Sequence, residues 1–205
     1  MDALSAFAIA FFFSFVGTLP PGSLTLTVIQ LGLNRRMDSA IRMSVAAAIV
    51  EYPYAWIAVE FQELISRSLD ITHNFQLFCS LVMIALGALN LLSTVKSPSN
   101  RISRLQENGF RAGIVLGVLN PLAIPFWIAM TAYLKSRGWV TLSNNLELHA
   151  YLLGVSAGTL AVFILLARMA ERIVSRFKIN PVLPKLPGAL LIVLGVYAFG
   201  EYMFG

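Results

Sequence analysis

The sequence contains few charged residues for its length. Only 12% of its 205 residues are Asp, Glu, Lys or Arg, whereas 58% are hydrophobic, and the mean hydropathy is +0.76. Soluble domains average roughly 25% charged and about 45–50% apolar residues. Because a soluble domain needs polar residues to cover its surface, this composition favours an integral membrane protein, with the lipid bilayer as a partner.

Cysteine and histidine are scarce as well. The single cysteine, Cys79, excludes an internal disulfide framework and a redox cysteine pair, and the two histidines argue against a histidine-rich metal site. The sequence has no phosphate-binding loop, serine hydrolase motif or zinc protease motif, so we expect no enzyme, no cofactor and no bound metal. The net charge of +5 is scattered between apolar runs, which argues against nucleic acid as a partner.

Six apolar segments are long enough to cross a bilayer, which takes a helix of roughly 20 residues. They cover residues 3–33, 43–59, 74–95, 112–134, 150–167 and 186–200, the last extending to Phe204. The sequence therefore predicts an all-α integral membrane protein with six transmembrane helices in one domain, residues 1–205. A cleavable signal peptide is not favoured at the start, because Met1-Asp2 provides no positive charge.

The basic residues provide an independent test of the six spans. Most of them fall in three loops that six spans place on one side of the membrane: Arg35, Arg36 and Arg42; Lys96, Arg101, Arg104 and Arg111; and Arg168, Arg172, Arg176, Lys178 and Lys185. The opposite side has only Arg67, Lys135 and Arg137. By the positive-inside rule, both chain termini are predicted to lie outside the cytoplasm.

A short internal repeat relates the first and fourth spans. Gly17-Thr18-Leu19-Pro20-Pro21 recurs as Gly117-Val118-Leu119-Asn120-Pro121, 100 positions later. Since each half would hold three spans, an odd number, the halves would lie upside down relative to each other, as in many secondary transporters. We predict two inverted three-helix repeats, at about residues 1–95 and 111–205, joined by a loop at 96–110.

Prolines are predicted to break the first and fourth helices at this motif. A proline lacks the amide hydrogen and crowds the carbonyl four residues before it. Pro21 and Pro121 thereby free the carbonyls of Gly17 and Gly117. A second proline releases one more carbonyl in each helix, that of Val16 by Pro20 and that of Pro121 by Pro125.

The freed backbone groups indicate a binding site inside the protein. Unpaired backbone is not tolerated in lipid, so it must be covered by protein or line a wet cavity. After the first break, Gly22 and Ser23 can restart the helix with Ser23 as N-cap, and the amide groups there attract an anion such as a carboxylate. Asn120 lies at the second break. The alternative is that both breaks are ordinary kinks that only shape packing.

Glu51 lies near the middle of the second span and is its only charged residue. A carboxylate at this depth is costly and usually faces a cavity, a cation or a proton path. Glu51 could bind the ammonium group of a zwitterionic solute, carry a coupling proton or ligate a cation; alternatively, it makes a structural hydrogen bond to the freed backbone. Tyr54, three residues later, lies near the same helix face.

These motifs resemble those of the lysine exporter (LysE/RhtB) family of bacterial inner-membrane amino-acid exporters. Pro20-Pro21-Gly22-Ser23 is similar to the family's Pro-Gly-Pro motif, and Asn120-Pro121 is similar to its Asn-Pro motif. The resemblance implies export of an amino acid or similar small solute, driven by the proton gradient, by a homo-oligomer. Ser23 replaces the second proline of the motif, Leu122 replaces the usual lysine and Glu51 is added, so the charge preference for the solute is open.

We therefore predict a proton-coupled exporter of a small amino acid or amino-acid derivative. Its predicted substrate-binding residues are Gly17, Pro20, Pro21, Gly22, Ser23, Glu51, Tyr54, Gly117, Asn120, Pro121 and Pro125, and Glu51 is also the candidate for proton coupling. One alternative is a divalent cation exporter of the same superfamily, although a metal ion usually needs several ligands. The other is a non-transporting membrane scaffold.

Overall fold

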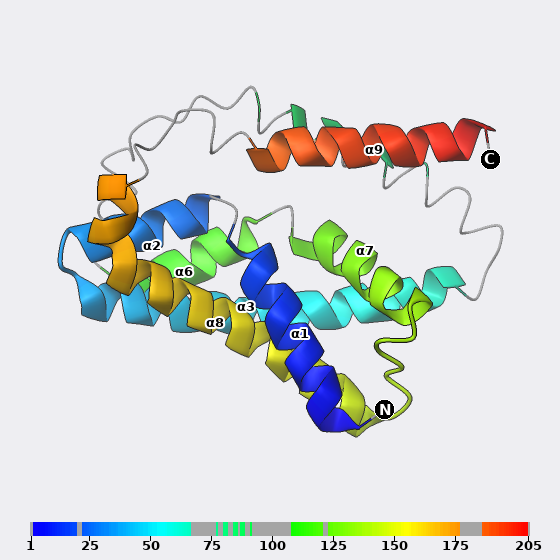
Figure 1. The fold of residues 1–205 in the computed structure, drawn as a ribbon, viewed down its shortest axis with the longest axis horizontal. Helices are drawn as coiled ribbons and strands as arrows, with labels where there is room; N and C mark the ends of the chain where they lie inside the picture. Colours follow the sequence, from blue (N-terminus) through cyan, green and yellow to red (C-terminus); the bar gives the residue numbers. More distant parts are fainter. Residues whose placement is uncertain are drawn as a thin grey trace.

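The chain forms helices throughout the residues that the structure describes. A computed structural model describes residues 2–19, 22–66, 108–120, 123–176 and 186–204, and scattered positions between 77 and 91. Its helices are α1 (Ala3–Gly17), α2 (Ser23–Leu33), α3 (Met37–Ser66), α6 (Gly109–Val118), α7 (Ala123–Ser136), α8 (Asn145–Arg176) and α9 (Leu186–Phe204), as Figure 1 shows. The predicted all-α class is confirmed.

The first and fourth predicted spans are both interrupted at the repeated motif. α1 ends at Gly17 and α2 begins at Ser23, whereas α6 ends at Val118 and α7 begins at Ala123. α6 and α7 are bent by 66° relative to each other. The proline positions Pro20, Pro21 and Pro121 fall in the two breaks and lie outside the described residues.

Not every predicted span stands out as a membrane helix. Among the described residues, α8 alone is long and apolar enough by itself, over Asn145–Ala170, and the bent pair α6–α7 passes as one broken span. α1 and α2 are apolar but short. α3 contains the predicted span 43–59, and α9 matches the predicted sixth span. Residues 74–95 lie largely outside the described part, so the total of six stays a prediction.

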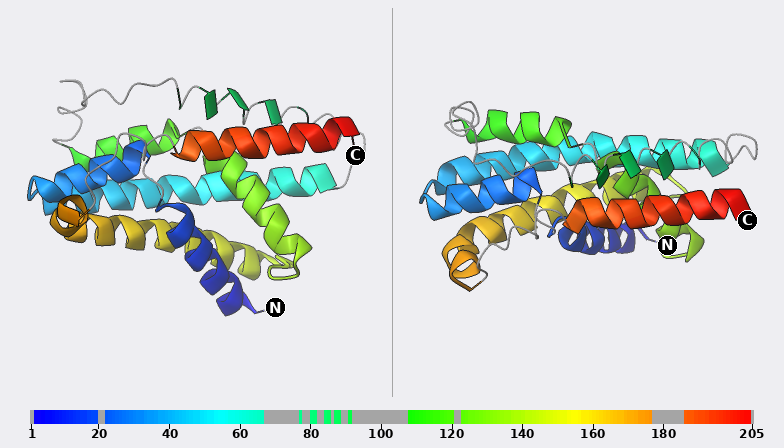
Figure 2. Two further views of the ribbon diagram at one scale, coloured as in Figure 1. Left: turned by 45° about the horizontal axis from the view of Figure 1, so that its top comes forward. Right: turned by 90° about the horizontal axis from the view of Figure 1, so that it is seen from above.

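The two halves of the chain pack across each other. Each half has a short helix, a break, a second short helix and a long helix: α1, α2 and α3 in one, and α6, α7 and α8 in the other. α1 and α2 pack mainly against α8, α6 and α7 pack mainly against α3, and the two long helices contact each other. Figure 2 shows α3 and α8 running along the molecule, with α9 at its edge.

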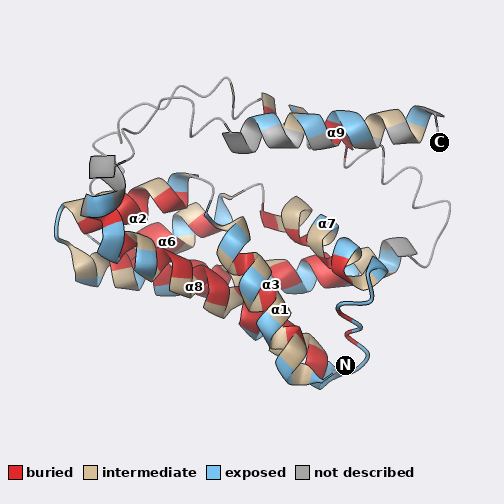
Figure 3. Cartoon of the chain, viewed as in Figure 1, coloured by how far each residue is buried: buried red, intermediate tan, exposed pale blue. Residues whose placement is uncertain are grey.

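Buried apolar residues form two clusters on different stretches of α3 and α8. Figure 3 shows the buried residues along these helices in red. The Trp127 cluster consists of Ala6, Ala10, Ala55, Ala58, Val59, Trp127, Leu134, Val140, Leu142, Tyr151, Leu152 and Val155. The Phe163 cluster consists of Leu24, Val28, Leu31, Ala40, Met43, Ala47, Ala112, Val162, Phe163 and Ala167. Neither cluster includes a residue between positions 48 and 54 of α3 or between positions 156 and 161 of α8.

The chain passes between these clusters at each break, and it does so in opposite directions. α1 belongs to the Trp127 cluster and α2 to the Phe163 cluster, whereas α6 belongs to the Phe163 cluster and α7 to the Trp127 cluster. The long helices also run oppositely, since α3 starts in the Phe163 cluster and α8 starts in the Trp127 cluster. Both breaks therefore lie between the two clusters.

Glycines allow the helices to approach closely at two seams. A Cβ at Gly154 of α8 would lie 2.4 Å from the carbonyl oxygen of Phe7, and one at Gly158 would lie 2.5 Å from that of Phe11, both in α1. In α6, a Cβ at Gly113 would lie 2.4 Å from the carbonyl oxygen of Met43 in α3. Glycines four residues apart allow close packing of membrane helices. The seams therefore join each broken helix to the long helix of the other half.

Candidate functional site

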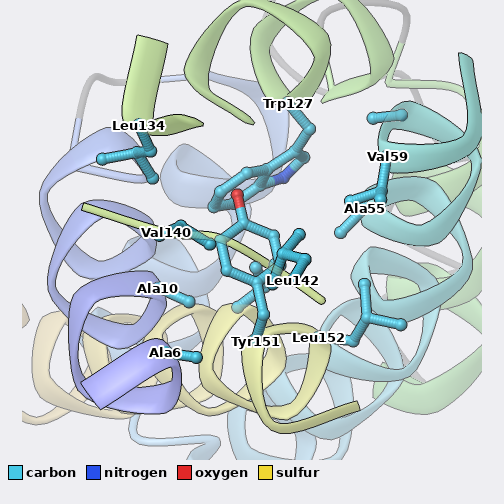
Figure 4. Close-up of a cluster of buried hydrophobic side chains, with 12 residues drawn as sticks. Ala6, Ala10, Ala55, Val59, Trp127, Leu134, Val140, Leu142, Tyr151 and Leu152 are labelled. Carbon is cyan, nitrogen blue, oxygen red and sulfur yellow. The ribbon is translucent and has the colours of Figure 1, made fainter. Parts of the chain in front are cut away.

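Glu51 lies on α3 in the interval between the two clusters. Its side chain is partly buried, and the indole Nε1 of Trp127 donates a hydrogen bond of 2.8 Å to its Oε2. Trp127 belongs to α7, the helix that restarts after the second break. Figure 4 shows Trp127 next to Tyr151, with the indole nitrogen directed towards α3. The carboxylate is therefore held against the second broken helix.

Tyr54 lies one turn further along α3 and contacts the other side of the same break. Its hydroxyl donates a hydrogen bond of 2.7 Å to the carbonyl of Val118, the last residue of α6. Tyr54, and not Glu51, thus bonds the backbone freed at the second break. One turn of α3 holds both the end of α6 and the start of α7.

The prediction that Pro121 leaves the Gly117 carbonyl free is wrong. The amide of Asn120 donates to this carbonyl at 3.0 Å, because the chain tightens into a turn after α6. Asn120 is partly buried at the break. Pro125 is the third residue of α7, where an amide hydrogen has no partner within the helix anyway, so this proline fits the start of α7 without breaking it.

Two predictions at the first break also need correction. Gly22, and not Ser23, is the N-cap of α2, because Gly22 has the extended backbone and its carbonyl accepts the amide of Leu26 at 2.9 Å. The carbonyl of Val16 is not left free either, because the amide of Leu19 donates to it at 3.2 Å. As Gly22 has no side chain to cap the helix, no side-chain cap bonds the first amides of α2.

A hydroxyl spans the first break. Thr25, in the first turn of α2, donates a weak hydrogen bond of 3.4 Å to the carbonyl of Thr18, which caps the end of α1. This contact is the counterpart of the Tyr54 contact at the second break, because each satisfies a carbonyl at the end of a broken helix. No sequence motif indicated Thr25.

The two breaks come close to each other at Gly17. A Cβ at this position would lie 2.5 Å from Cζ of Phe126, in the first turn of α7. Gly17 therefore accommodates the ring of Phe126, whose neighbour Trp127 bonds Glu51. Gly117 is buried against Val50 of α3, one residue before Glu51. The structure thus brings Gly17, Glu51, Tyr54, Gly117 and Asn120 to one level of the molecule, whereas Ser23 is exposed.

Further polar groups lie at this level on α1 and α8. Ser14 donates a hydrogen bond of 2.6 Å to the carbonyl of Val155, and its hydroxyl lies 3.0 Å from that of Thr159. The hydroxyl of Ser156 is buried and has no hydrogen-bond partner in the described part of the chain. These residues were missed, although small hydroxyl side chains within apolar helices are a recognisable signal for contacts between membrane helices.

Taken together, the site combines one acidic group, aromatic rings and backbone groups at helix ends. A carboxylate beside indole and phenol rings suits an ammonium group or a proton, and the amides at the start of α2 suit an anion. Among the described residues, no three His, Cys, Asp or Glu side chains gather to hold a metal ion.

A family model described as LysE type translocator matches residues 6–201. The chain belongs to the LysE type translocator family. The match covers almost the whole chain, including both breaks and all of the site, so the predicted resemblance is confirmed. Neither curated proteins nor solved structures give a significant match.

Membership of the LysE type translocator family defines the general activity. Members are integral membrane transporters and not enzymes, and they export amino acids or similar solutes. A small solute and the lipid bilayer are therefore the partners of this chain.

Proposed function

We propose that this LysE type translocator is a proton-coupled exporter of a small amino acid or amino-acid derivative across the bacterial inner membrane. The helix ends at the two breaks bind the solute carboxylate. Glu51 binds the ammonium group or carries the coupling proton. The substrate site consists of Gly17, Pro20, Pro21, Gly22, Ser23, Glu51, Tyr54, Gly117, Asn120, Pro121 and Pro125.

One observation carries this proposal. Among the described residues, Glu51 is the only charged residue in the interval between the two clusters, and it is hydrogen-bonded to a broken helix. Glu51 bonds Trp127 of α7 at 2.8 Å, and Tyr54, three residues away on α3, bonds the end of α6. A carboxylate inside a membrane protein is a functional group by default, because its insertion is costly. Its place beside a break supports a role in binding a solute or a proton.

An inverted repeat fits this function. The broken helices run between the clusters in opposite directions, and each packs on the long helix of the other half. These observations support two inverted repeats around a central site, the arrangement in which one repeat moves against the other to expose the site to each side in turn. Six spans in one domain and termini outside the cytoplasm complete the proposed architecture.

The alternatives receive less support from the geometry. A divalent cation would need several ligands, and Glu51 is the one carboxylate that the described residues place at the break. A scaffold would not require a carboxylate there.

Counterflow in liposomes tests the proposal directly. The purified protein is reconstituted in liposomes that are loaded with one unlabelled amino acid at a time. Uptake of the labelled form into these liposomes is followed with and without a pH gradient. We expect at least one amino acid to show counterflow. The Glu51→Gln variant, which keeps the shape of the side chain and removes its charge, is expected to fall to the level of empty liposomes.

The control is Glu60→Gln, which changes a carboxylate on the exposed face of the same helix. It is expected to retain native counterflow. Full transport by Glu51→Gln would remove Glu51 from the mechanism. Counterflow of manganese or cadmium in place of every amino acid would favour the cation exporter.

A further inference from the structure

Trp127 has a structural role that no sequence motif indicated. Its indole Nε1 is the hydrogen-bond donor to Glu51, and its side chain is only 2% exposed. It lies in α7, five positions into the helix that follows the second break. A buried indole whose polar atom faces a carboxylate contributes both apolar packing and one directed hydrogen bond.

Neighbouring rings fix the indole in place. Phe126 packs edge-on against it at 5.0 Å between ring centroids, and Tyr151 of α8 does so at 6.3 Å. Tyr151 is itself held by a 3.0 Å hydrogen bond to the hydroxyl of Thr131 in α7. Because Trp127 is packed on these sides, it cannot follow Glu51 to another position without moving α7.

The strength of this contact depends on whether Glu51 carries a proton. A hydrogen bond to an ionised carboxylate is roughly twice as strong as one between neutral groups. A donor that stabilises the ionised form lowers the affinity of the carboxylate for a proton. Because the two equilibria are linked, proton uptake weakens the hydrogen bond from the donor by the same factor. The bond is therefore tight when Glu51 is ionised and loose when it is protonated.

We propose that Trp127 is a positioning residue that holds the ionised carboxylate of Glu51 against the start of α7 and releases it when Glu51 takes up a proton. This rests on the role of Glu51 in the proposed function. The contact joins α3 to the second broken helix, so its release lets α7 move relative to α3. Proton uptake thereby acts on the helix that borders the site.

Among the residues that the structure describes, a small set of other titratable groups lies near this contact. On α3 itself, Tyr52 and Tyr54 follow Glu51, and Tyr54 bonds the end of α6. From α8 come Tyr151, behind the indole, and His149, whose Nδ1 lies 2.6 Å from the hydroxyl of Tyr52. α1 and α2 contain no titratable side chain, α6 has only Arg111 in its first turn, and α7 has only Tyr133 and Lys135 in its last turns. Trp127 is therefore the main polar group acting on Glu51 from α7.

The proposal is tested by infrared titration of the full-length protein in liposomes, without any solute. The band of the protonated Glu51 carboxyl is identified by its loss in Glu51→Gln, and its midpoint is followed against pH. In Trp127→Phe, which removes the N–H and keeps an aromatic ring, we expect the midpoint to rise by about one pH unit, equivalent to about a tenfold weaker hold.

A matched control comes from the same helix. Trp56 donates its indole N–H to Glu60 at 3.1 Å on the exposed face of α3, so Trp56→Phe removes the same kind of bond elsewhere. In Trp56→Phe, the titration midpoint of the Glu51 carboxyl is expected to equal that of the native protein. If Trp127→Phe does not fold, benzothienylalanine at position 127 removes the N–H from a ring of the same shape.

An unchanged midpoint in the Trp127 variants overturns the proposal, as does a Glu51 carboxyl that shows no protonated band at any pH. An unchanged midpoint leaves the proposed function intact, because that is judged by counterflow, whereas the absence of a protonated band would restrict Glu51 to binding the ammonium group. Conversely, full counterflow by Glu51→Gln would refute the proposed role of Glu51 even if the infrared midpoint shifts.

Discussion

At the scale of single residues, the chemistry of donors and acceptors decides which side chain bonds which group. An ionised carboxylate only accepts hydrogen bonds, and so does a carbonyl, whereas a phenol can donate. Tyr54 therefore satisfies the carbonyl of Val118, and Glu51 takes the N–H of Trp127. Within the described part of the chain, Glu51 bonds this indole and no backbone group at the breaks.

Tyr54→Phe is expected to destabilise the second break. The substitution removes the donor to the carbonyl of Val118, and because this contact is exposed, we expect a loss of about 0.5–1.5 kcal/mol, the usual net contribution of one hydrogen bond. Denaturant unfolding in detergent micelles measures the loss. The control is Tyr197→Phe on α9, whose ring is 69% exposed, and it is expected to be neutral. Equal stability of the two variants would mean that the break does not depend on Tyr54.

At the scale of helices, packing depends on how closely the backbones approach. α1 lies on Gly154 and Gly158 of α8, which occur four residues apart, and the hydroxyl of Ser14 bonds the backbone of α8 within the same seam. In lipid, helices associate through such close contacts because the surrounding chains are as apolar as the side chains. This seam holds the first broken helix in position beside the site.

Gly154→Ala is expected to push α1 away from α8. The new Cβ would lie 2.4 Å from the backbone oxygen of Phe7, which cannot yield without moving the helix, so we expect a loss of about 1–3 kcal/mol. Thermal unfolding in detergent is the measurement. Gly200→Ala in α9 meets no atom within 4 Å and is the matched control, expected to be neutral or slightly stabilising. If Gly154→Ala unfolds at the same temperature as the native protein, the backbones of α1 and α8 do not approach closely enough at this position to exclude a methyl group.

At the scale of the whole molecule, charge is distributed unequally between the two ends. The ends of the helices nearest the Phe163 cluster carry Arg35, Arg36, Arg42, Arg111, Arg168 and Arg172. The opposite end carries Asp2, Glu60, Glu63 and Glu147, together with Arg137 and with Lys135, which is paired to Glu63 at 3.2 Å. The end rich in arginine is expected to face the cytoplasm.

Labelling of intact bacteria with a membrane-impermeant maleimide tests this orientation. In a Cys79→Ser background, Ser143→Cys lies in the exposed connection between α7 and α8 and is expected to react. Asn34→Cys, in the exposed turn between α2 and α3, is expected to react only after the cells are opened. The reverse pattern would place the termini in the cytoplasm. Labelling of both cysteine variants in intact cells would contradict a fixed orientation.

Much of the local structure follows from sequence. Helix breaks at 17–23 and 118–123 are predictable because proline removes a helix hydrogen bond wherever it occurs. The N-cap at Gly22 and the turn at Asn120 were less predictable, since neighbouring groups compete for the same carbonyls over one or two residues. The glycine seams could have been found from their spacing, although not which helix lies against them.

Composition and covalent geometry, which depend on the sequence alone, determined that this chain is an apolar, helical membrane protein with two broken helices and a carboxylate in its second span. Only the tertiary structure decided what that carboxylate touches. Glu51 and Trp127 are 76 positions apart, and Tyr54 and Val118 are 64 positions apart. No local pattern encodes such pairs, because they form only when α3 packs against both halves of the second broken helix.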